Sequence, residues 1–298
     1  MSENLKLPAY GGQALIEGVL MRGKNYLAAS FRKPDGTIET ITEKLSGIYL
    51  SPIRKIPFLR GMLLLWDSLV LGTRYLTLSA NLQAAEEDEK IEGTSLVLTL
   101  LLSMILFILI FFLVPSAIGQ GFENWLKISS WWSNVLEGII RLLFVVGYMW
   151  LVGKMDDIER VFGYHGAEHK TINTFEDGRP LTVESVQESS LVHPRCGTSF
   201  LLTLVIISVL VFAFVGPQSV LIRLLSRIVL LPIIIGIAYE YIRFASNHLD
   251  SKFIQWLMVP NLALQGLTTR PPSDGMVEIA LSAFNAMYAL ENEKPSAT

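Results

Sequence analysis

Three histidines and one cysteine, side chains that bind soft and borderline metal ions, are concentrated in one polar stretch of this sequence. His165 and His169 are four residues apart, and His193 and Cys196 follow within about thirty residues. If the segment from Asp157 to Phe175 is helical, the first two imidazoles project from one face, the spacing with which two histidines bind one zinc ion. The pattern predicts a divalent metal ion, zinc by preference, with these four side chains as candidate ligands.

Glu168 adds the carboxylate that a metal-dependent hydrolase uses as its base. The order His-x-x-Glu-His is that of the inverted zincins, in which the histidines bind the ion and the glutamate accepts a proton from water. Two arrangements stay open. If His165, His169, His193 and Cys196 all bind the ion, the shell is closed and structural, whereas three of them leave a position that Glu168 serves as catalytic base. A plainer interpretation makes the histidines and Glu168 a solvated helix face and Cys196 a small buried hydrophobe.

The composition excludes an ordinary soluble domain and indicates a membrane protein. Of the 298 residues, 51% are hydrophobic and 17% are charged, and the mean hydropathy is +0.45. The net charge of -3 is too small for a nucleic-acid-binding surface. A single cysteine excludes an internal disulfide, which fits a thiol kept reduced on the cytosolic side. The expected partners are membrane lipids, membrane proteins or a second copy of this chain, and not nucleic acid.

Four apolar stretches predict transmembrane helices. The first, Leu96 to Val114, has 19 residues and no charge, close to the roughly 20 residues needed to cross a hydrocarbon core. The segment from Pro115 to Asn134, which carries three tryptophans, is expected to be a connector at the lipid headgroup level. The other three predicted spans are Val135 to Val152, Gly197 to Val215 and Val220 to Phe244.

Charged residues within these stretches need partners. Glu137 and Arg141 are four residues apart in the second stretch and can form a structural pair. Arg227 lies a turn or more inside the fourth stretch, where a lone charge is costly, so it needs a polar partner. These residues are expected to hold helices together.

The distribution of basic residues sets the predicted orientation. The loop with the candidate metal ligands contains five basic residues, whereas the connector from Pro115 to Asn134 contains only Lys127. By the positive-inside rule, this loop lies in the cytosol, and with four spans both termini lie there too. The five basic residues of the loop are Lys154, Arg160, Lys170, Arg179 and Arg195.

The N-terminal part contains the strand signals of the chain. Lys33-Pro34-Asp35-Gly36 lies between two alternating stretches and predicts a β-hairpin of residues 27–31 and 37–41. Tyr10 to Gly23 is punctuated by glycines and carries Glu17 and Arg22, so it either lines the site or forms a tight turn. We expect it to pack against the candidate metal loop.

Three further helices are expected beside the spans. Residues 58–82 have helical spacing, but Asp67 and Arg74 favour an interfacial or half-buried helix over a full span. The run 253–267 is broken by Pro260 and is too short to cross, which suits a helix lying on the membrane. After Ser273, an amphipathic helix is predicted, with its apolar residues on one face. That face consists of Val277, Leu281, Phe284 and Tyr288.

The predicted fold is therefore mainly α. It is a polytopic membrane protein with about four transmembrane helices plus a cytosolic part containing a small β-hairpin and interfacial and amphipathic helices. The expected order along the chain is a cytosolic N-terminal segment, an interfacial helix, two spans, the cytosolic loop, two spans and a cytosolic C-terminal segment. These units cover residues 1–57, 58–90, 91–153, 154–196, 197–244 and 245–298.

Four stretches together resemble a known family. The chain is similar over nearly its whole length to the uncharacterised bacterial inner-membrane family represented by YqhQ, which is described as a predicted metal-dependent enzyme. The resemblance implies a multi-pass protein of the bacterial inner (plasma) membrane in which these stretches are important. They are Gly11 to Gly23, Tyr164 to Asn173, His193 to Phe200 and Gln265 to Pro271.

Two functions of different classes fit these features. The first is a membrane-embedded, cytosol-facing metal-dependent hydrolase, with His165, His169 and His193 or Cys196 as ligands, Glu168 as base, and a lipid-linked or membrane-proximal peptide substrate. The second is a non-enzymatic subunit or scaffold of a larger membrane assembly, in which the His/Cys cluster is structural. A transporter is disfavoured because only four spans are predicted, with few paired charges at mid-membrane.

Overall fold

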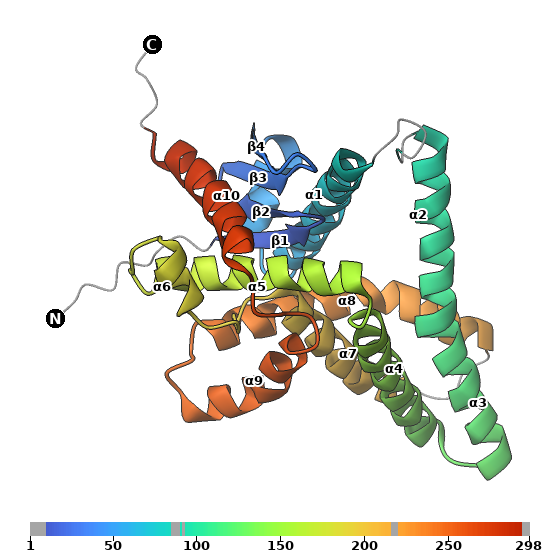
Figure 1. Ribbon diagram of the computed structural model, residues 1–298. Helices are drawn as coiled ribbons and strands as arrows, with labels where there is room; N and C mark the ends of the chain where they lie inside the picture. The colour runs from blue at the N-terminus through green and yellow to red at the C-terminus, as the bar shows by residue number, and fades with distance from the viewer. Residues whose placement is uncertain (1–9, 85–89, 91–92, 216–219, 294–298) are drawn as a thin grey trace.

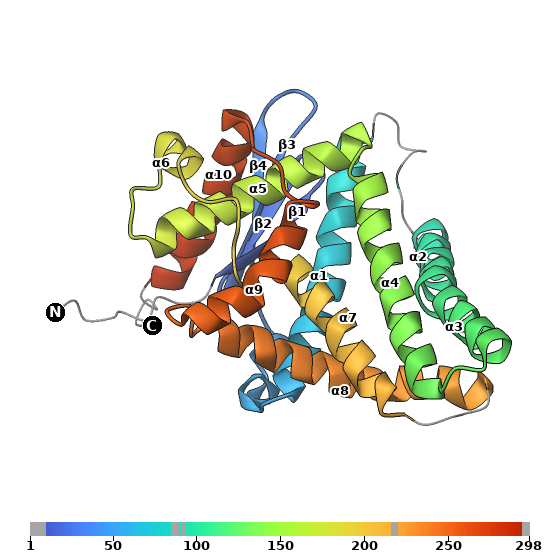
Figure 2. The same cartoon turned by 90° about the horizontal axis from the view of Figure 1, so that it is seen from below.

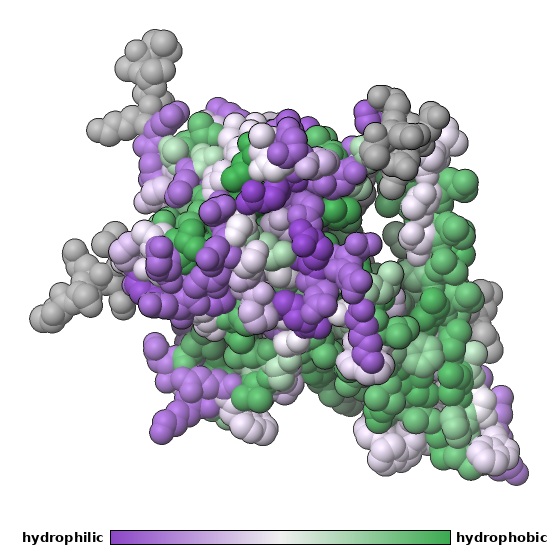
Figure 3. Space-filling model, in the orientation of Figure 1, coloured by the Kyte–Doolittle hydropathy of each residue, from purple (hydrophilic) through white to green (hydrophobic). Residues whose placement is uncertain are grey.

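The computed structural model (Figure 1) describes residues 10–84, 90, 93–215 and 220–293. The face drawn in Figure 3 has a polar half and an apolar half. The polar half is built on a small sheet with helices on both faces. The apolar half consists mainly of long helices. Figure 3 shows hydrophilic residues gathered over the polar half and hydrophobic residues along the helices at the right.

Four strands form one antiparallel sheet in the order β1-β2-β3-β4. The predicted hairpin is confirmed as β3 (Tyr26–Arg32) and β4 (Ile38–Lys44). The glycine-punctuated stretch forms two more strands, β1 (Gly11–Leu15) and β2 (Gly18–Arg22), so the prediction of a single hairpin was too small. Leu15 pairs with Gly18, which leaves two residues for the turn between β1 and β2.

The two faces of the sheet bury alternate residues of its strands, as the two-residue period of a strand requires. Val19 and Met21 pack against α5 (Asp156–Glu176) and α10 (Asp274–Asn292). Leu20, between them, packs on the opposite face against α1 (Leu59–Gln83). Two short helices, η1 (Gly47–Leu50) and η2 (Pro52–Lys55), lead from the sheet into α1.

The amphipathic helix predicted after Ser273 is confirmed as α10, and its buried residues include Val277, Leu281 and Phe284. Its last turn also ties down the β2–β3 turn. The Glu291 carboxylate accepts the backbone N–H groups of Asn25 and Tyr26 at 2.5 and 2.9 Å. The last helix of the described chain thus covers part of one face of the sheet and holds its β2–β3 turn in place.

Three helices in the described part of the chain are long and apolar enough to cross a membrane, judged by length and composition: residues 93–126, 130–152 and 225–246. The first joins α2 (Gly93–Ile108), the π turn η4 (Leu109–Leu113) and α3 (Val114–Leu126). The others belong to α4 (Ser130–Val152) and α8 (Val220–Ser246). A fourth apolar helix, α7 (Gly197–Ala213), is shorter.

The first long helix corrects one prediction. Pro115 does not begin a connector, because the helix continues through it to Leu126. Proline has no N–H to donate to the turn before it, which here is the π turn η4 that contains Phe111. The Nε–H of Arg141 on α4 donates to the Phe111 carbonyl at 3.0 Å. A neighbouring helix therefore binds backbone in the turn that the proline interrupts, as neighbouring helices do where membrane helices contain proline.

Arg141 belongs to a buried polar network. The network contains the predicted Glu137–Arg141 pair and the polar partner that Arg227 was expected to need. Glu137 accepts from Arg141 at 2.7 Å and from Arg227 of α8 at 3.0 and 3.2 Å. Arg227 also donates to the Asn134 side chain at 2.9 Å and lies over the Phe212 ring at 4.0 Å. The network thus links α4, α7 and α8, and it buries Glu137, Arg141 and Arg227 inside the protein.

α7 packs closely along α4 in the opposite direction. The Asn134 amide, near the start of α4, donates to the carbonyls of Phe212 and Val215 at the end of α7. Midway, Gly138 leaves room for Val209, which a side chain there would displace. Figure 2 shows α7 between α4 and α9 (Lys252–Gln265). α9 continues through Pro260, so that proline does not break the helix as predicted.

Candidate metal centre

α5 carries His165 and His169 on one face, as predicted from their spacing. The helix covers Asp156–Glu176, and the two ring centroids are 4.4 Å apart. In Figure 1, α5, the helix that carries both histidines, runs between the sheet and the apolar helices.

The chain folds back after α5 and brings Cys196 to the histidines. Gly178 adopts a φ of +67°, and the short helix α6 (Val183–Gln187) follows. The Thr182 hydroxyl caps that helix by accepting the N–H of Ser185 at 3.3 Å. The Cys196 Sγ then lies 3.3 Å from the Nε2 of His165.

His165, His169 and Cys196 form a group that fits a metal ion. One ligand atom from each residue lies within 4.8 Å of the others. Imidazole nitrogens and a thiolate sulfur are the donors that zinc prefers. The Cys196 Sγ also lies 3.2 Å from the Thr198 hydroxyl, which is placed to orient the sulfur.

Backbone carbonyls orient both imidazoles toward the shared space. His165 Nδ1 lies 2.8 Å from the carbonyl oxygen of Thr268, and His169 Nδ1 lies 2.6 Å from that of Leu191. A carbonyl only accepts, so each Nδ1 carries the proton and each Nε2 presents a lone pair. The His169 Nε2 is fully buried and has no hydrogen-bond partner among the described residues. A bound ion would satisfy this otherwise costly group.

His193 lies beside this group but is directed elsewhere. Its ring is 5.7 Å from that of His169, measured between centroids, and its Nε2 is 3.6 Å from a Glu176 carboxylate oxygen. Burial lowers the pKa of His193, although Glu176 acts in the opposite sense. Of the four predicted ligands, His165, His169 and Cys196 are brought together, and His193 is adjacent to them.

Glu168 is buried between α5 and the sheet. One of its carboxylate oxygens lies 4.0 Å from the His165 Nε2. Burial raises the pKa of Glu168 to about 7, whereas His165 and a hydrogen bond from the Gly12 N–H act to lower it. The backbone of β1 comes close to Glu168 at Gly12, since a Cβ at this position would lie only 2.7 Å from the Glu168 Cγ. Two basic residues of the same segment are engaged elsewhere: Lys170 with the carbonyls of Gln187 and Ser189, and Arg195 with Glu176.

The glycine-punctuated stretch packs against α5, which confirms that prediction. Glu17, in the turn between β1 and β2, accepts two hydrogen bonds of 2.6 Å from Arg160 and one of 3.0 Å from the Tyr164 hydroxyl. Burial alone would raise the pKa of Glu17, but these hydrogen bonds outweigh it and lower the pKa. Arg22 instead pairs with Asp67 of α1.

Several supporting residues have no chemical signal in the sequence. The Gln265 side chain accepts the N–H of His193 at 3.0 Å and donates to its carbonyl at 2.8 Å, which fixes the returning chain. Glu176 pairs with Arg195 and lies 3.6 Å from the His193 Nε2. Gln265 and Thr268 lie within one of the four stretches on which the family resemblance rests, but no spacing rule assigns either a role.

Comparison with known proteins places the chain beside sequences without an assigned activity. The family described as "Protein of unknown function (DUF1385)" matches residues 56–290. A Bacillus subtilis (strain 168) protein described as "Uncharacterized protein YqhQ" is 34% identical over 315 residues, covering 99% of this chain and 99% of the relative. No solved structure matches the chain.

Proposed function

The chain belongs to the DUF1385 family, and from its own residues we propose that it is a membrane-embedded metal-dependent hydrolase with a cytosol-facing site. His165, His169 and Cys196 hold one divalent metal ion, zinc by preference, and Glu168 is the catalytic base. The observation that carries the proposal is the set of three ligand atoms within 4.8 Å of one another. Zinc sites with three protein ligands keep a fourth position for chemistry.

In the proposed reaction, some residues orient the metal ligands and Glu168 transfers a proton. In this site the ion supplies a Lewis acid that polarises the bond to be hydrolysed and lowers the pKa of water. The carbonyls of Leu191 and Thr268 hold the ligand rings in one orientation. Glu168 lies next to the ligands without belonging to their group, so its carboxylate accepts the proton of the attacking water.

A membrane location follows from the helices and is part of the proposal. α7 has 17 residues and extends about 26 Å at 1.5 Å per residue, close to the thickness of a hydrocarbon core. Its end lies beside the start of α4, which supports α7 as a fourth crossing. With four crossings, the site and both termini lie in the cytosol of a bacterium, at its inner membrane. A lipid-linked molecule or a membrane-proximal peptide meets the site there.

We expect the metal ion to be lost when His165 or Cys196 is replaced. Removing a residue that only orients a ligand typically costs about 10–100-fold in metal affinity, and removing the ligand itself costs at least as much. Elemental analysis of purified His165→Ala and Cys196→Ser should therefore fall from one ion per chain to background. Both variants should lose the hydrolysis of chromogenic carboxylic and phosphate esters together with the ion. Wild-type protein should lose this activity when a chelator removes the metal and regain it when zinc is added back.

His248→Ala is the matched control for the histidine variant. His248 is the fourth histidine of the chain; its ring stacks on Phe244 with centroids 4.3 Å apart, and it is not part of the group. It should keep the ion. His193→Ala tests whether His193 is a fourth ligand. The variant should keep the ion if only His165, His169 and Cys196 bind it, and should lose the ion if His193 binds it too. Full metal content in both His165→Ala and Cys196→Ser would contradict the site.

Burial of the ligands favours a second candidate, a structural metal centre in a non-enzymatic subunit or scaffold. His169 and His193 are nearly inaccessible, and only 16% of the His165 side chain is exposed. The two candidates differ in whether the ion has an exchangeable position. Cobalt substitution tests this, because azide should shift the visible spectrum of an open site and leave that of a closed site unchanged.

A further inference from the structure

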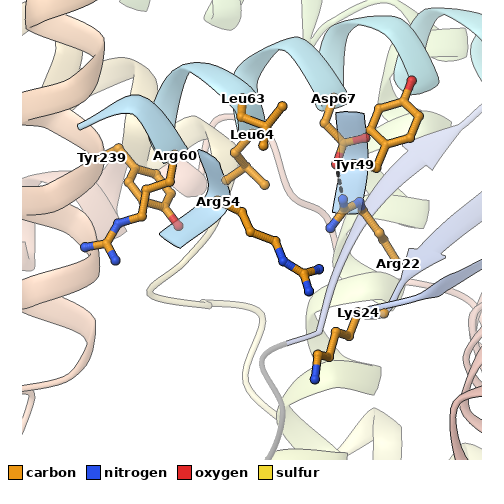
Figure 4. A pocket seen from close by; sticks show the side chains of 10 residues that line it. Arg22, Lys24, Tyr49, Arg54, Arg60, Leu63, Leu64, Asp67 and Tyr239 are labelled. Carbon is orange, nitrogen blue, oxygen red and sulfur yellow. Dashed lines mark ion pairs between the residues drawn. The ribbon is translucent and has the colours of Figure 1, made fainter. Parts of the chain in front are cut away.

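A pocket of about 320 Å³ lies away from the metal ligands, between the sheet, η2, α1 and α8. It is lined by segments that are distant in the sequence. Figure 4 shows its residues arranged beneath α1. They are Arg22, Gly23, Lys24, Tyr49, Arg54, Arg60, Leu63, Leu64, Asp67 and Tyr239.

The pocket carries more positive than negative charge. Two of its four basic residues are neutralised, since Arg22 pairs with Asp67 and Arg60 pairs with Glu240 of α8. The other two, Lys24 and Arg54, take part in no ion pair among the described residues. Figure 4 shows both extending into the open space beneath α1. The pocket therefore offers two unpaired cations to an anionic ligand.

The wall beside these cations is apolar and exposed. Leu63 and Leu64 line the pocket, and η2, the link to α1 and other faces of α1 expose further large hydrophobic side chains. A soluble protein rarely exposes so many large hydrophobic side chains together, whereas a membrane surface can cover them. The exposed residues are Ile53, Ile56, Phe58, Leu59, Met62 and Trp66.

The pocket lies near the membrane surface in the proposed topology. α1 is anchored to α8 by the Arg60–Glu240 pair and by Gly61, where a Cβ would be 2.6 Å from the Tyr239 side chain. α8 ends on the cytosolic side, and Tyr239 lies in its last two turns. Tyrosine is favoured at the headgroup level, and cytosolic cations there attract anionic lipids.

We propose that this pocket binds the phosphate headgroup of an anionic phospholipid, with the acyl chains along the apolar side of η2 and α1. Lys24 and Arg54 contact the phosphate, as Arg and Lys do in other phosphate sites. The site makes no use of the metal ligands, so it stands or falls independently of the hydrolase.

Calorimetric titration of the delipidated protein in a non-ionic detergent tests the proposal. The probes are dioctanoyl phosphatidylglycerol, dioctanoyl phosphatidylcholine and inorganic phosphate. Phosphatidylglycerol should bind at least ten times more tightly than phosphatidylcholine, and inorganic phosphate should compete only weakly. Lys24→Gln/Arg54→Gln should weaken phosphatidylglycerol binding at least tenfold, because both unpaired cations are removed.

Lys44→Gln/Lys55→Gln is the matched control, with the same loss of charge. Both lysines are exposed, and Lys55 directly follows Arg54, but neither lines the pocket. This control should bind phosphatidylglycerol within threefold of the wild type. If the two double variants lose the same amount of affinity for phosphatidylglycerol, the loss comes from general charge attraction, and the proposed contacts of Lys24 and Arg54 are wrong. Equal binding of the two lipids by the wild type would overturn the proposal, and inorganic phosphate competing as well as the lipid would overturn its lipid source.

Discussion

A Glu168→Gln variant is expected to keep its metal ion and its fold but to lose about 10²- to 10⁴-fold of the hydrolytic rate, the usual contribution of a general base. Glutamine has the shape of glutamate, and its carbonyl oxygen can still accept the hydrogen bond from Gly12. A neutral amide is also less costly to bury than a carboxylate. It cannot accept the proton of water, so only the chemistry should suffer.

The measurement pairs turnover of chromogenic esters with elemental analysis of the same protein sample. Glu159→Gln is the matched control, because Glu159 lies on the same helix, is largely exposed and is 3.8 Å from Arg270. It should keep both the ion and the rate. A Glu168→Gln variant with an unchanged rate would remove Glu168 as the base. Loss of the ion in that variant would instead make Glu168 a ligand.

Glu137→Ala is expected to destabilise the protein by about 3–5 kcal/mol, the cost of breaking a buried ion pair on one side. Glu137 is 1% exposed and is the carboxylate that pairs with both Arg141 and Arg227. Without it, two guanidinium groups stay buried with one another as neighbours. The loss should appear as a lower midpoint in unfolding by denaturing detergent, followed by circular dichroism.

A second substitution tests the cause of that loss. Glu137→Ala/Arg227→Leu removes one of the orphaned charges and should recover part of the lost stability. Glu278→Ala is the surface comparison, since Glu278 is about half exposed and pairs with Arg32 at 3.3 Å. An exposed pair contributes only about 0–1 kcal/mol. A double variant less stable than Glu137→Ala would show that Arg227 is held by other groups.

Helical spacing sufficed to predict the local part of the candidate metal site. The spacing of His165 and His169 placed both rings on one face of α5, because helix geometry depends on near neighbours alone. The choice between Cys196 and His193 depended on the path of a returning chain. Gln265, from a helix far along the sequence, fixes that path, and no local pattern encodes such a contact. The sequence therefore identified the ligand candidates and left the ligand set open.

Two gaps in the predicted fold have the same physical origin. Pro115 marked the end of a helix, because the sequence does not show that Arg141 donates to the Phe111 carbonyl. The glycines between Tyr10 and Gly23 left a site lining or a tight turn open and gave no signal for β1 and β2, because strand pairing depends on a partner. In the fold, Gly12 allows β1 to approach Glu168 closely. Glycine and proline lower local propensity, and tertiary contacts decide the outcome.

The bond between Glu291 and the β2–β3 turn has a consequence for biosynthesis. It joins groups 266 residues apart, so the strands leave the ribosome long before α10 is made. The part of the sheet face that α10 covers stays open until synthesis reaches the end of that helix. A chain cut short before α10 would leave these strand residues exposed to proteases.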